Sequence, residues 1–150
     1  VPVWATADSA AVPAAFTVAL GRWGCFLNGC CGGTETSVPW AVTFPADPAG
    51  VLRHPVQLYY AFGALFIGAL LQWTEHNLLS FGEDRRVRGA VLWPLFMVSY
   101  ALLRITADPF RAEYGTAGLR SARIIAFAVL ASGVLWLACS LLYRRERKKC

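Results

Sequence analysis

Residues 55–74 read PVQLYYAFGALFIGALLQWT and contain no charged side chain. A helix rises about 1.5 Å per residue, so about 20 residues match the roughly 30 Å hydrocarbon core of a bilayer. A second uncharged run of the same length covers residues 124–143. These two runs predict transmembrane helices and a fold built around them.

Two further segments complete the predicted bundle. Residues 89–103 are apolar and reach the length of a span if Arg104 and Ile105 lie at the membrane interface. The segment before Gly21 carries Pro13 and is too short to span alone, so we expect a bundle helix that leads into a polar turn. The sequence therefore predicts an all-α integral membrane helix bundle, with three transmembrane helices plus one N-terminal helix in a single domain, residues 1–150.

The composition agrees with a membrane protein. Charged residues make up 15% of the chain, against about 25% in ordinary soluble domains. The excess of positive charge lies in residues 83–88 (EDRRVR) and 144–149 (RRERKK). The positive-inside rule places both clusters, and hence the C-terminus, on the cytoplasmic side. Residues 34–54 and 106–122 then share the opposite face. Because topology explains the basic tail, we expect no nucleic-acid partner.

Residues 9–34 contain a single charged residue, Arg22. A guanidinium does not deprotonate, so an apolar setting is costly unless an anion or hydrogen-bond acceptors meet it. Arg104 repeats this feature at the end of another apolar run. Two such arginines suggest one shared anionic ligand, and the abundant anion in a membrane is lipid phosphate.

The segment around Arg22, residues 21–33, reads GRWGCFLNGCCGG. Its glycines allow close backbone approach and expose N–H groups, which suits a polar headgroup, and Asn28 is placed to orient a ligand hydroxyl. In the alternative interpretation the glycines serve helix packing and Arg22 extends to the interface. Both interpretations remain open on the sequence alone.

Three cysteines in the same segment raise a metal or redox hypothesis. Structural zinc sites favour cysteine pairs separated by two to four residues, with a second pair elsewhere. The spacing here is C-x4-C-C, formed by Cys25, Cys30 and Cys31. This pattern indicates a zinc site poorly, so we expect no metal ion and no other cofactor.

Polar residues also cluster where the first uncharged run begins, in RHPVQLYYAFG, residues 53–63. His54 precedes the first turn, where a titratable imidazole can face the aqueous side. Gln57 and Tyr59 place polar groups in the first turns of a membrane helix. An interfacial aromatic belt explains Tyr59 equally well.

Arg104, Asp108 and Arg111 recur at positions i, i+4 and i+7. A continuous helix would place them on one face, as a rigid ladder with net positive charge. Pro109 complicates this arrangement, because the residue before a proline avoids the helical region. The alternatives are a helix that breaks at Asp108 and a purely structural ion network.

These stretches, in this order, resemble the C-terminal half of the bacterial prolipoprotein diacylglyceryl transferases. The family's GR-x-G-x-F-x-N-G and HP-x-QLY stretches are matched by GRWGCFLNG and HPVQLYYA. LLRITADPFR, PWAVTFP and, more loosely, GLRSARI are similar to later or intervening stretches. The resemblance implies a transferase in the bacterial inner (plasma) membrane. Such enzymes move the diacylglyceryl group of phosphatidylglycerol to the lipobox cysteine of a precursor protein, forming a thioether and releasing glycerol phosphate.

The resemblance also implies roles for individual residues. Arg22 and Arg104 would clamp the lipid phosphate as catalytic residues, and His54 is the third catalytic candidate. The residues expected to bind the substrates are Asn28, Gln57, Tyr59, Asp108 and Arg111. Cys25 and Cys30 stand where well-known members have asparagine and glutamate.

The family's N-terminal half, with its HGG-type stretch, has no counterpart in these 150 residues. We therefore expect a fragment or a shortened version of a larger membrane enzyme. Two other functions remain open. One is a non-catalytic membrane protein that binds anionic phospholipid through the same arginines. The other is a thiol redox or metal-binding membrane protein.

Overall fold

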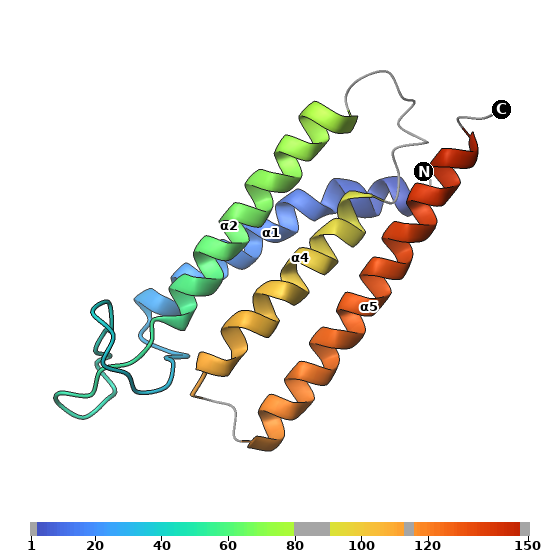
Figure 1. Cartoon of the computed structure of the whole chain (residues 1–150). Helices are drawn as coiled ribbons and strands as arrows, with labels where there is room; N and C mark the ends of the chain where they lie inside the picture. Colours follow the sequence, from blue (N-terminus) through green and yellow to red (C-terminus); the bar gives the residue numbers. More distant parts are fainter. Residues whose placement is uncertain (1–2, 80–90, 113–115, 148–150) are drawn as a thin grey trace.

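The computed structural model describes residues 3–79, 91–112 and 116–147, and four α-helices dominate it (Figure 1). They are α1 (Val3–Leu27), α2 (Val56–Thr74), α4 (Leu92–Ala107) and α5 (Thr116–Arg147). A π-helical turn, η1 (Glu75–Leu79), follows α2, and a 3-10 turn, η2 (Asp108–Phe110), follows α4. The described residues form isolated β-bridges but no strand, so the predicted all-α fold is confirmed.

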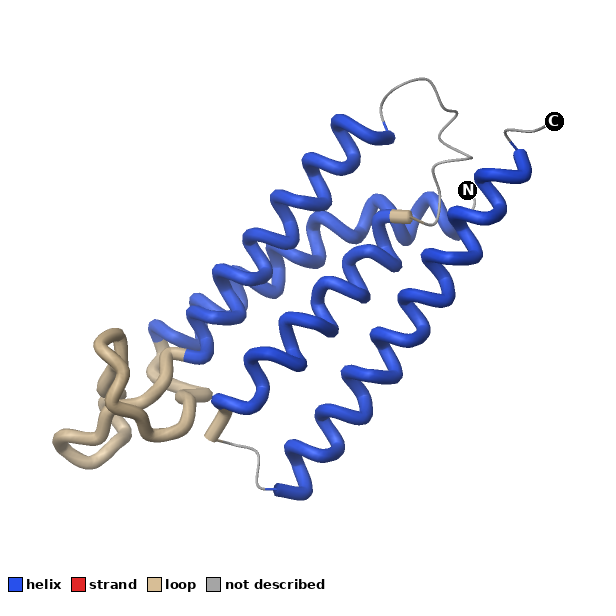
Figure 2. Tube along the Cα trace, in the orientation of Figure 1, coloured by secondary structure: helices blue, strands red, loops and turns tan. Residues whose placement is uncertain are grey.

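Successive helices run in opposite directions, and the loop between α1 and α2 lies at the same end of the bundle as the end of α4 (Figure 2). Backbone contacts join these segments: Gly33 bridges Arg111, and the Thr34 N–H donates to the Phe110 carbonyl at 2.8 Å. The loop that contains residues 34–54 therefore lies at the same end of the bundle as the described part of residues 106–122, as predicted. Which side of the membrane this end faces stays a prediction.

The structure does not show the side chains of the two basic segments from which the membrane orientation is predicted. Residues 83–88 lie outside the described chain, and the structure gives no side-chain environment for residues 144–149. The cytoplasmic placement of the C-terminus therefore stays a prediction.

Three described helices are long and apolar enough to cross a membrane: Thr6–Leu27, Val56–Asn77 and Ser121–Leu142. The number agrees with the prediction but the set differs. Helix α1 qualifies, whereas α4 has 16 residues, which corresponds to about 24 Å and falls short of the bilayer core.

The prediction of a polar turn at Gly21 is wrong, because α1 continues through GRWGC to Leu27. A helical glycine costs only about 1 kcal/mol relative to alanine, and tertiary packing readily exceeds that cost. The packing is aromatic here. The Trp23 ring lies 5.7 Å from the Phe62 ring, and the Phe26 ring lies 6.2 Å from the Phe44 ring, centroid to centroid.

The helices pack closely at small residues. Helix α2 packs against α1 and α4, while α5 packs mainly against α4. A Cβ atom on Gly63 of α2 would lie 2.4 Å from a Leu103 methyl of α4, and one on Gly133 of α5 would lie 3.0 Å from Val98. Glycine therefore sets the approach of both helix pairs, as is common in membrane bundles.

Helix α5 leaves many large apolar side chains exposed. They are Ile124, Ile125, Phe127, Val134, Leu135, Leu141 and Leu142. In water such a surface would be unfavourable, whereas lipid tails cover it without cost. This face supports the membrane assignment.

Asp8 provides a connection between helices that the sequence alone does not predict. It lies in α1 with 7% of its surface exposed. Its carboxylate accepts hydrogen bonds from the backbone N–H groups of Val91 at 3.1 Å and Trp93 at 2.9 Å. These groups lie at the start of α4, where N–H groups lack helical partners. Asp8 therefore caps α4 from a different helix.

We expect Asp8→Ala to lower the free energy of unfolding by about 1–2 kcal/mol, the usual cost of losing an N-cap. Asp8→Asn retains one carbonyl acceptor and should lose less. Equilibrium unfolding of the three proteins in detergent tests this. Equal stability of Asp8→Ala and the unaltered chain would contradict the capping role.

Candidate functional site

Arg22 lies near the end of α1 and is half-buried. Its guanidinium carbon lies 4.7 Å from the centroid of the Tyr60 ring, which is a cation–π arrangement. Among the residues that the structure describes, no carboxylate pairs with Arg22 and no side-chain hydrogen bond engages it. Its five N–H donors are therefore available to an anion.

Tyr60 connects Arg22 to a second arginine. The Tyr60 hydroxyl donates to one carboxylate oxygen of Asp108. The Nε and Nη2 atoms of Arg104 donate to the other oxygen, each at 3.2 Å. Asp108 and Tyr60 are both 1% exposed. We call Arg22, Tyr60, Arg104 and Asp108 the arginine–tyrosine cluster.

The cluster carries net positive charge, since its members include two guanidiniums and one carboxylate. Both aspartate oxygens are occupied by Tyr60 and Arg104, which fixes the carboxylate rigidly. Elements α1, α2, α4 and η2 each contribute one member. The structure thus brings together Arg22, Arg104 and Asp108, although Arg22 is far from the other two in the sequence.

Arg111 departs from the predicted ladder. Helix α4 ends at Ala107 and η2 occupies Asp108–Phe110, so the alternative of a break at Asp108 is confirmed. Pro109 contributes to the break because it lacks an N–H donor for the helix. Asp108 nevertheless keeps helical dihedral angles (φ −58°, ψ −32°), so the expectation that the residue before the proline avoids the helical region is wrong here. Arg111 has extended backbone geometry (φ −82°, ψ 130°) and bridges Gly33 instead.

We expect Asp108→Ala to lower the free energy of unfolding by about 2 kcal/mol. Breaking a fully buried ion pair costs about 3–5 kcal/mol, and partial exposure of Arg104 reduces this figure. Asp108→Asn keeps an acceptor for Tyr60 and should lose less. Thermal unfolding in detergent measures the difference. An Asp108→Ala protein as stable as the unaltered chain would show that the pair is not structural.

His54 and Tyr59 meet in a separate aromatic group. The Tyr59 hydroxyl lies 3.1 Å from His54 Nδ1 and accepts a hydrogen bond from Trp40 Nε1 at 2.7 Å. The Phe110 ring lies 5.0 Å from the imidazole, centroid to centroid. We call Trp40, His54, Tyr59 and Phe110 the loop aromatic cluster. No hydrogen bond between described residues joins His54 or Tyr59 to either arginine.

Gln57 lies one helical turn before Tyr60, on the same face of α2. It is 1% exposed, and its Nε2 atom donates to the Cys30 carbonyl at 2.6 Å. Its Oε1 atom is buried without a partner among the described residues. Because an unpaired buried acceptor costs about 1–3 kcal/mol, this oxygen is a candidate acceptor for a ligand hydroxyl.

Asn28 follows the end of α1 and is exposed. Its side chain hydrogen-bonds the Cys30 thiol, which is the first of the interactions that lower the pKa of that thiol below its ordinary value. Burial opposes this effect. Asn28 therefore lies beside the cysteines, and the described contacts do not place it in the arginine–tyrosine cluster.

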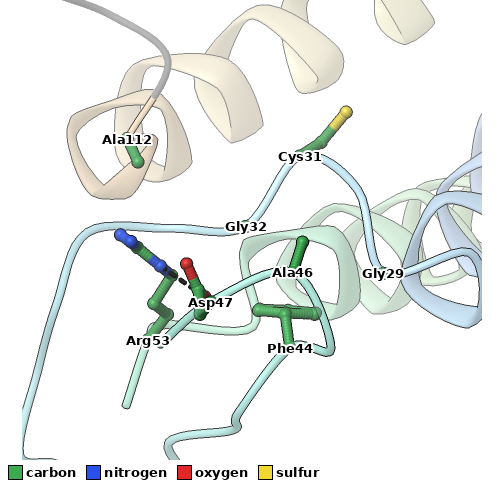
Figure 3. A pocket seen from close by; sticks show the side chains of 8 residues that line it. All are labelled: Gly29, Cys31, Gly32, Phe44, Ala46, Asp47, Arg53 and Ala112. Carbon is green, nitrogen blue, oxygen red and sulfur yellow. Dashed lines mark hydrogen bonds and ion pairs between the residues drawn. The ribbon is translucent and has the colours of Figure 1, made fainter. Parts of the chain in front are cut away.

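A pocket of about 270 Å³ lies within the loop end of the molecule (Figure 3). Its lining residues are Gly29, Cys31, Gly32, Phe44, Ala46, Asp47, Arg53 and Ala112. Arg53 Nε donates to Asp47 at 2.7 Å, and this hydrogen bond raises the pKa of Arg53. Because Asp47 neutralises Arg53, this arginine stabilises the loop and leaves little charge for a ligand.

Sequence reasoning missed Tyr60, although a signal was present. Gln57 and Tyr60 are three residues apart, so they share a helix face if residues 55–74 form a helix. The tyrosine that faces the arginines is thus Tyr60, while Tyr59 turns to the loop aromatic cluster.

Comparison with known proteins identifies the family that this chain resembles. The family model described as prolipoprotein diacylglyceryl transferase matches residues 1–139. A phosphatidylglycerol–prolipoprotein diacylglyceryl transferase of Synechococcus elongatus is 31% identical, and the match covers 91% of this chain and 49% of the relative. The enzyme of that name from Haemophilus influenzae strain PittEE is 52% identical over 72% of this chain and 38% of its own length. The enzyme of that name from Solidesulfovibrio magneticus is 36% identical, and the match covers 89% of this chain and 50% of the relative.

The chain spans at most about half the length of these curated relatives. The family match nevertheless runs from the first residue through most of α5 and includes every residue of the arginine–tyrosine cluster. The similarity and the site therefore lead to one conclusion: this chain belongs to the prolipoprotein diacylglyceryl transferase family.

Proposed function

We propose that the chain binds the phosphate of phosphatidylglycerol and serves transfer of the diacylglyceryl group to the lipobox cysteine of a precursor protein. One observation carries this proposal. The half-buried Arg22 guanidinium has an aromatic face but no acidic partner among the described residues, and Tyr60 links it to Arg104 through Asp108. A fixed positive charge of this kind is suited to an anionic headgroup.

The reaction forms a carbon–sulfur bond at the glyceryl carbon and breaks the carbon–oxygen bond to the phosphate. Glycerol phosphate leaves with the bonding electrons, so negative charge grows on the phosphate oxygens. Arg22 and Arg104 stabilise that charge, while Tyr60 and Asp108 hold the guanidiniums in place. The nucleophilic sulfur belongs to the precursor protein, and its thiolate is the reactive form.

The remaining site residues have supporting roles in this proposal. His54 is the candidate proton acceptor for the incoming thiol, oriented by Tyr59. Gln57 offers its buried oxygen to a headgroup hydroxyl. Asn28 and Arg111 border the same end of the bundle and contribute to substrate binding there.

A reconstituted transfer assay tests the proposal. Vesicles that contain phosphatidylglycerol and a lipobox peptide are incubated with the 150-residue chain, and with the same chain extended by its upstream genomic sequence. Thioether-linked product from either protein supports a transferase. Saturable phosphatidylglycerol binding without product from both proteins would instead favour a non-catalytic lipid-binding protein.

The proposed location is the bacterial inner membrane, with the C-terminus in the cytoplasm and the loop end on the opposite side. The basic segments 83–88 and 144–149 support this orientation. A reporter fused after Cys150 should lie in the cytoplasm. A reporter inserted near Ala46 should lie on the opposite side of the membrane. The reverse pattern would place the candidate site on the wrong side for a secreted precursor.

A further inference from the structure

Three cysteine side chains converge at the end of α1 and in the turn that follows it, without a role in the proposed reaction. The sulfur atoms of Cys25, Cys30 and Cys31 all lie within 4.8 Å of one another, and those of Cys30 and Cys31 are 3.8 Å apart. All three are thiols rather than disulfides, and all are half-buried. We call these residues the cysteine cluster.

The spacing of the sulfur atoms matches that around a thiophilic metal ion. A zinc–thiolate bond is about 2.3 Å long, so two thiolates in a tetrahedral shell are separated by about 3.8 Å. The observed separation between Cys30 and Cys31 is the same. A disulfide requires a sulfur–sulfur distance of about 2.05 Å. In the structure, the Cys31 thiol donates to the Cys30 sulfur and the Cys30 thiol donates to the Cys25 carbonyl. The three sulfur atoms are close enough together to ligate one ion, which would replace these thiol hydrogen bonds.

The backbone at the cysteine cluster is strained at one residue. Cys31 has φ 61°, in the left-handed region that non-glycine residues seldom adopt. Such strain, about 1–3 kcal/mol, is typical of functional positions. Nearby, the buried Gln57 amide donates to the Cys30 carbonyl and so anchors the turn to α2. Both features hold the sulfur atoms together.

The spacing along the sequence predicted no metal ion, but the three sulfur atoms lie close together in space. We propose that Cys25, Cys30 and Cys31 bind a soft, thiophilic metal ion of the zinc(II) or copper(I) class. Three metal–sulfur bonds form, and the three thiol protons pass to solvent. Copper(I) is satisfied by three thiolates, whereas zinc(II) takes a fourth ligand such as water. The bound ion would rigidify the turn between α1 and the loop, next to Arg22.

Metal titration of the full chain tests this proposal. The protein is purified in detergent, reduced, transferred without oxygen to chelator-free buffer, and titrated with zinc(II) and separately with copper(I) against competing chelators. We expect one ion per chain from at least one of the two titrations, and the tighter ion identifies the metal. X-ray absorption at the metal edge should show three sulfur atoms at about 2.3 Å. Failure of both ions to bind at this stoichiometry overturns the proposal.

Single substitutions define the ligands. Cys25→Ser, Cys30→Ser and Cys31→Ser should each weaken binding by at least about 100-fold, since loss of even an outer-shell partner costs about 10- to 100-fold. Cys139→Ser is the matched control, because Cys139 is exposed on α5 and lies outside the cluster. Equal losses in Cys139→Ser and the cluster variants would also overturn the proposal.

A measurement on the unaltered protein avoids any folding defect of the variants. Bound metal should protect the three clustered cysteines from alkylation, as mapped by mass spectrometry, compared with the same protein without metal. Alkylation unaffected by the metal would contradict the site. Because these assays contain no lipid or peptide, their outcome is independent of the transferase proposal.

Discussion

We expect replacement of Arg22 by alanine to lower the rate of the proposed diacylglyceryl transfer by about 1,000-fold, the upper range for loss of one charge-stabilising donor. The guanidinium lies against Tyr60 without an acidic partner among the described residues, so its charge is directed to the ligand. Truncation removes that charge where the phosphate oxygens become more negative. The reconstituted assay with phosphatidylglycerol and a lipobox peptide measures this loss.

Two comparisons make the Arg22 result specific. Arg123→Ala removes an exposed arginine from α5 and should leave transfer unchanged. The unfolding temperature of Arg22→Ala should stay close to that of the unaltered protein, because the described structure assigns Arg22 one cation–π contact and no ion pair. Transfer by Arg22→Ala at the unaltered rate would exclude Arg22 from the site.

We expect replacement of Arg104 by lysine to lower the proposed transfer by about 100-fold, or about 2.7 kcal/mol in transition-state stabilisation. Lysine keeps the positive charge but loses the planar fork. In the structure, two nitrogens of Arg104 hold one oxygen of Asp108, and a single ammonium cannot reproduce this geometry while also facing a phosphate. Both kcat and kcat/KM should fall, because the interaction strengthens as charge develops.

Arg123→Lys is the matched control for the Arg104 substitution, since it makes the same chemical change at an exposed position. It should leave the rate unaltered. If Arg104→Lys transfers lipid as fast as the unaltered chain, a positive charge at position 104 is sufficient for transfer. The proposed role of the planar guanidinium in binding the phosphate is then wrong.

Much of the fold was predictable from the distribution of charge. Uncharged runs of bilayer length identified α2 and most of α5. The end of α1 was not predictable in the same way. Gly21 and Gly24 indicate a turn locally, and the ring contacts of Trp23 and Phe26 that keep the segment helical involve residues distant in sequence.

The candidate site was predictable in part, for a related reason. Arginines in apolar segments are costly, so the sequence alone marks Arg22 and Arg104 as candidates for a functional role. It does not mark Tyr60, because a tyrosine in a membrane helix has many ordinary explanations. The three cysteines of the cysteine cluster did raise a metal or redox hypothesis from the sequence, but their spacing gave no indication that the three sulfur atoms lie within 4.8 Å of one another.

The central claim is that Arg22 and Arg104 act on one phosphate, and a double-mutant cycle tests it most directly. Binding of a short-chain phosphatidylglycerol is measured for the unaltered protein, Arg22→Ala, Arg104→Ala and the double variant. We predict that each single variant binds more weakly and that the double variant loses less than the sum, with a coupling energy of about 1 kcal/mol or more. Additive losses, within about 0.5 kcal/mol, would show that the two arginines act independently and would contradict a shared phosphate site.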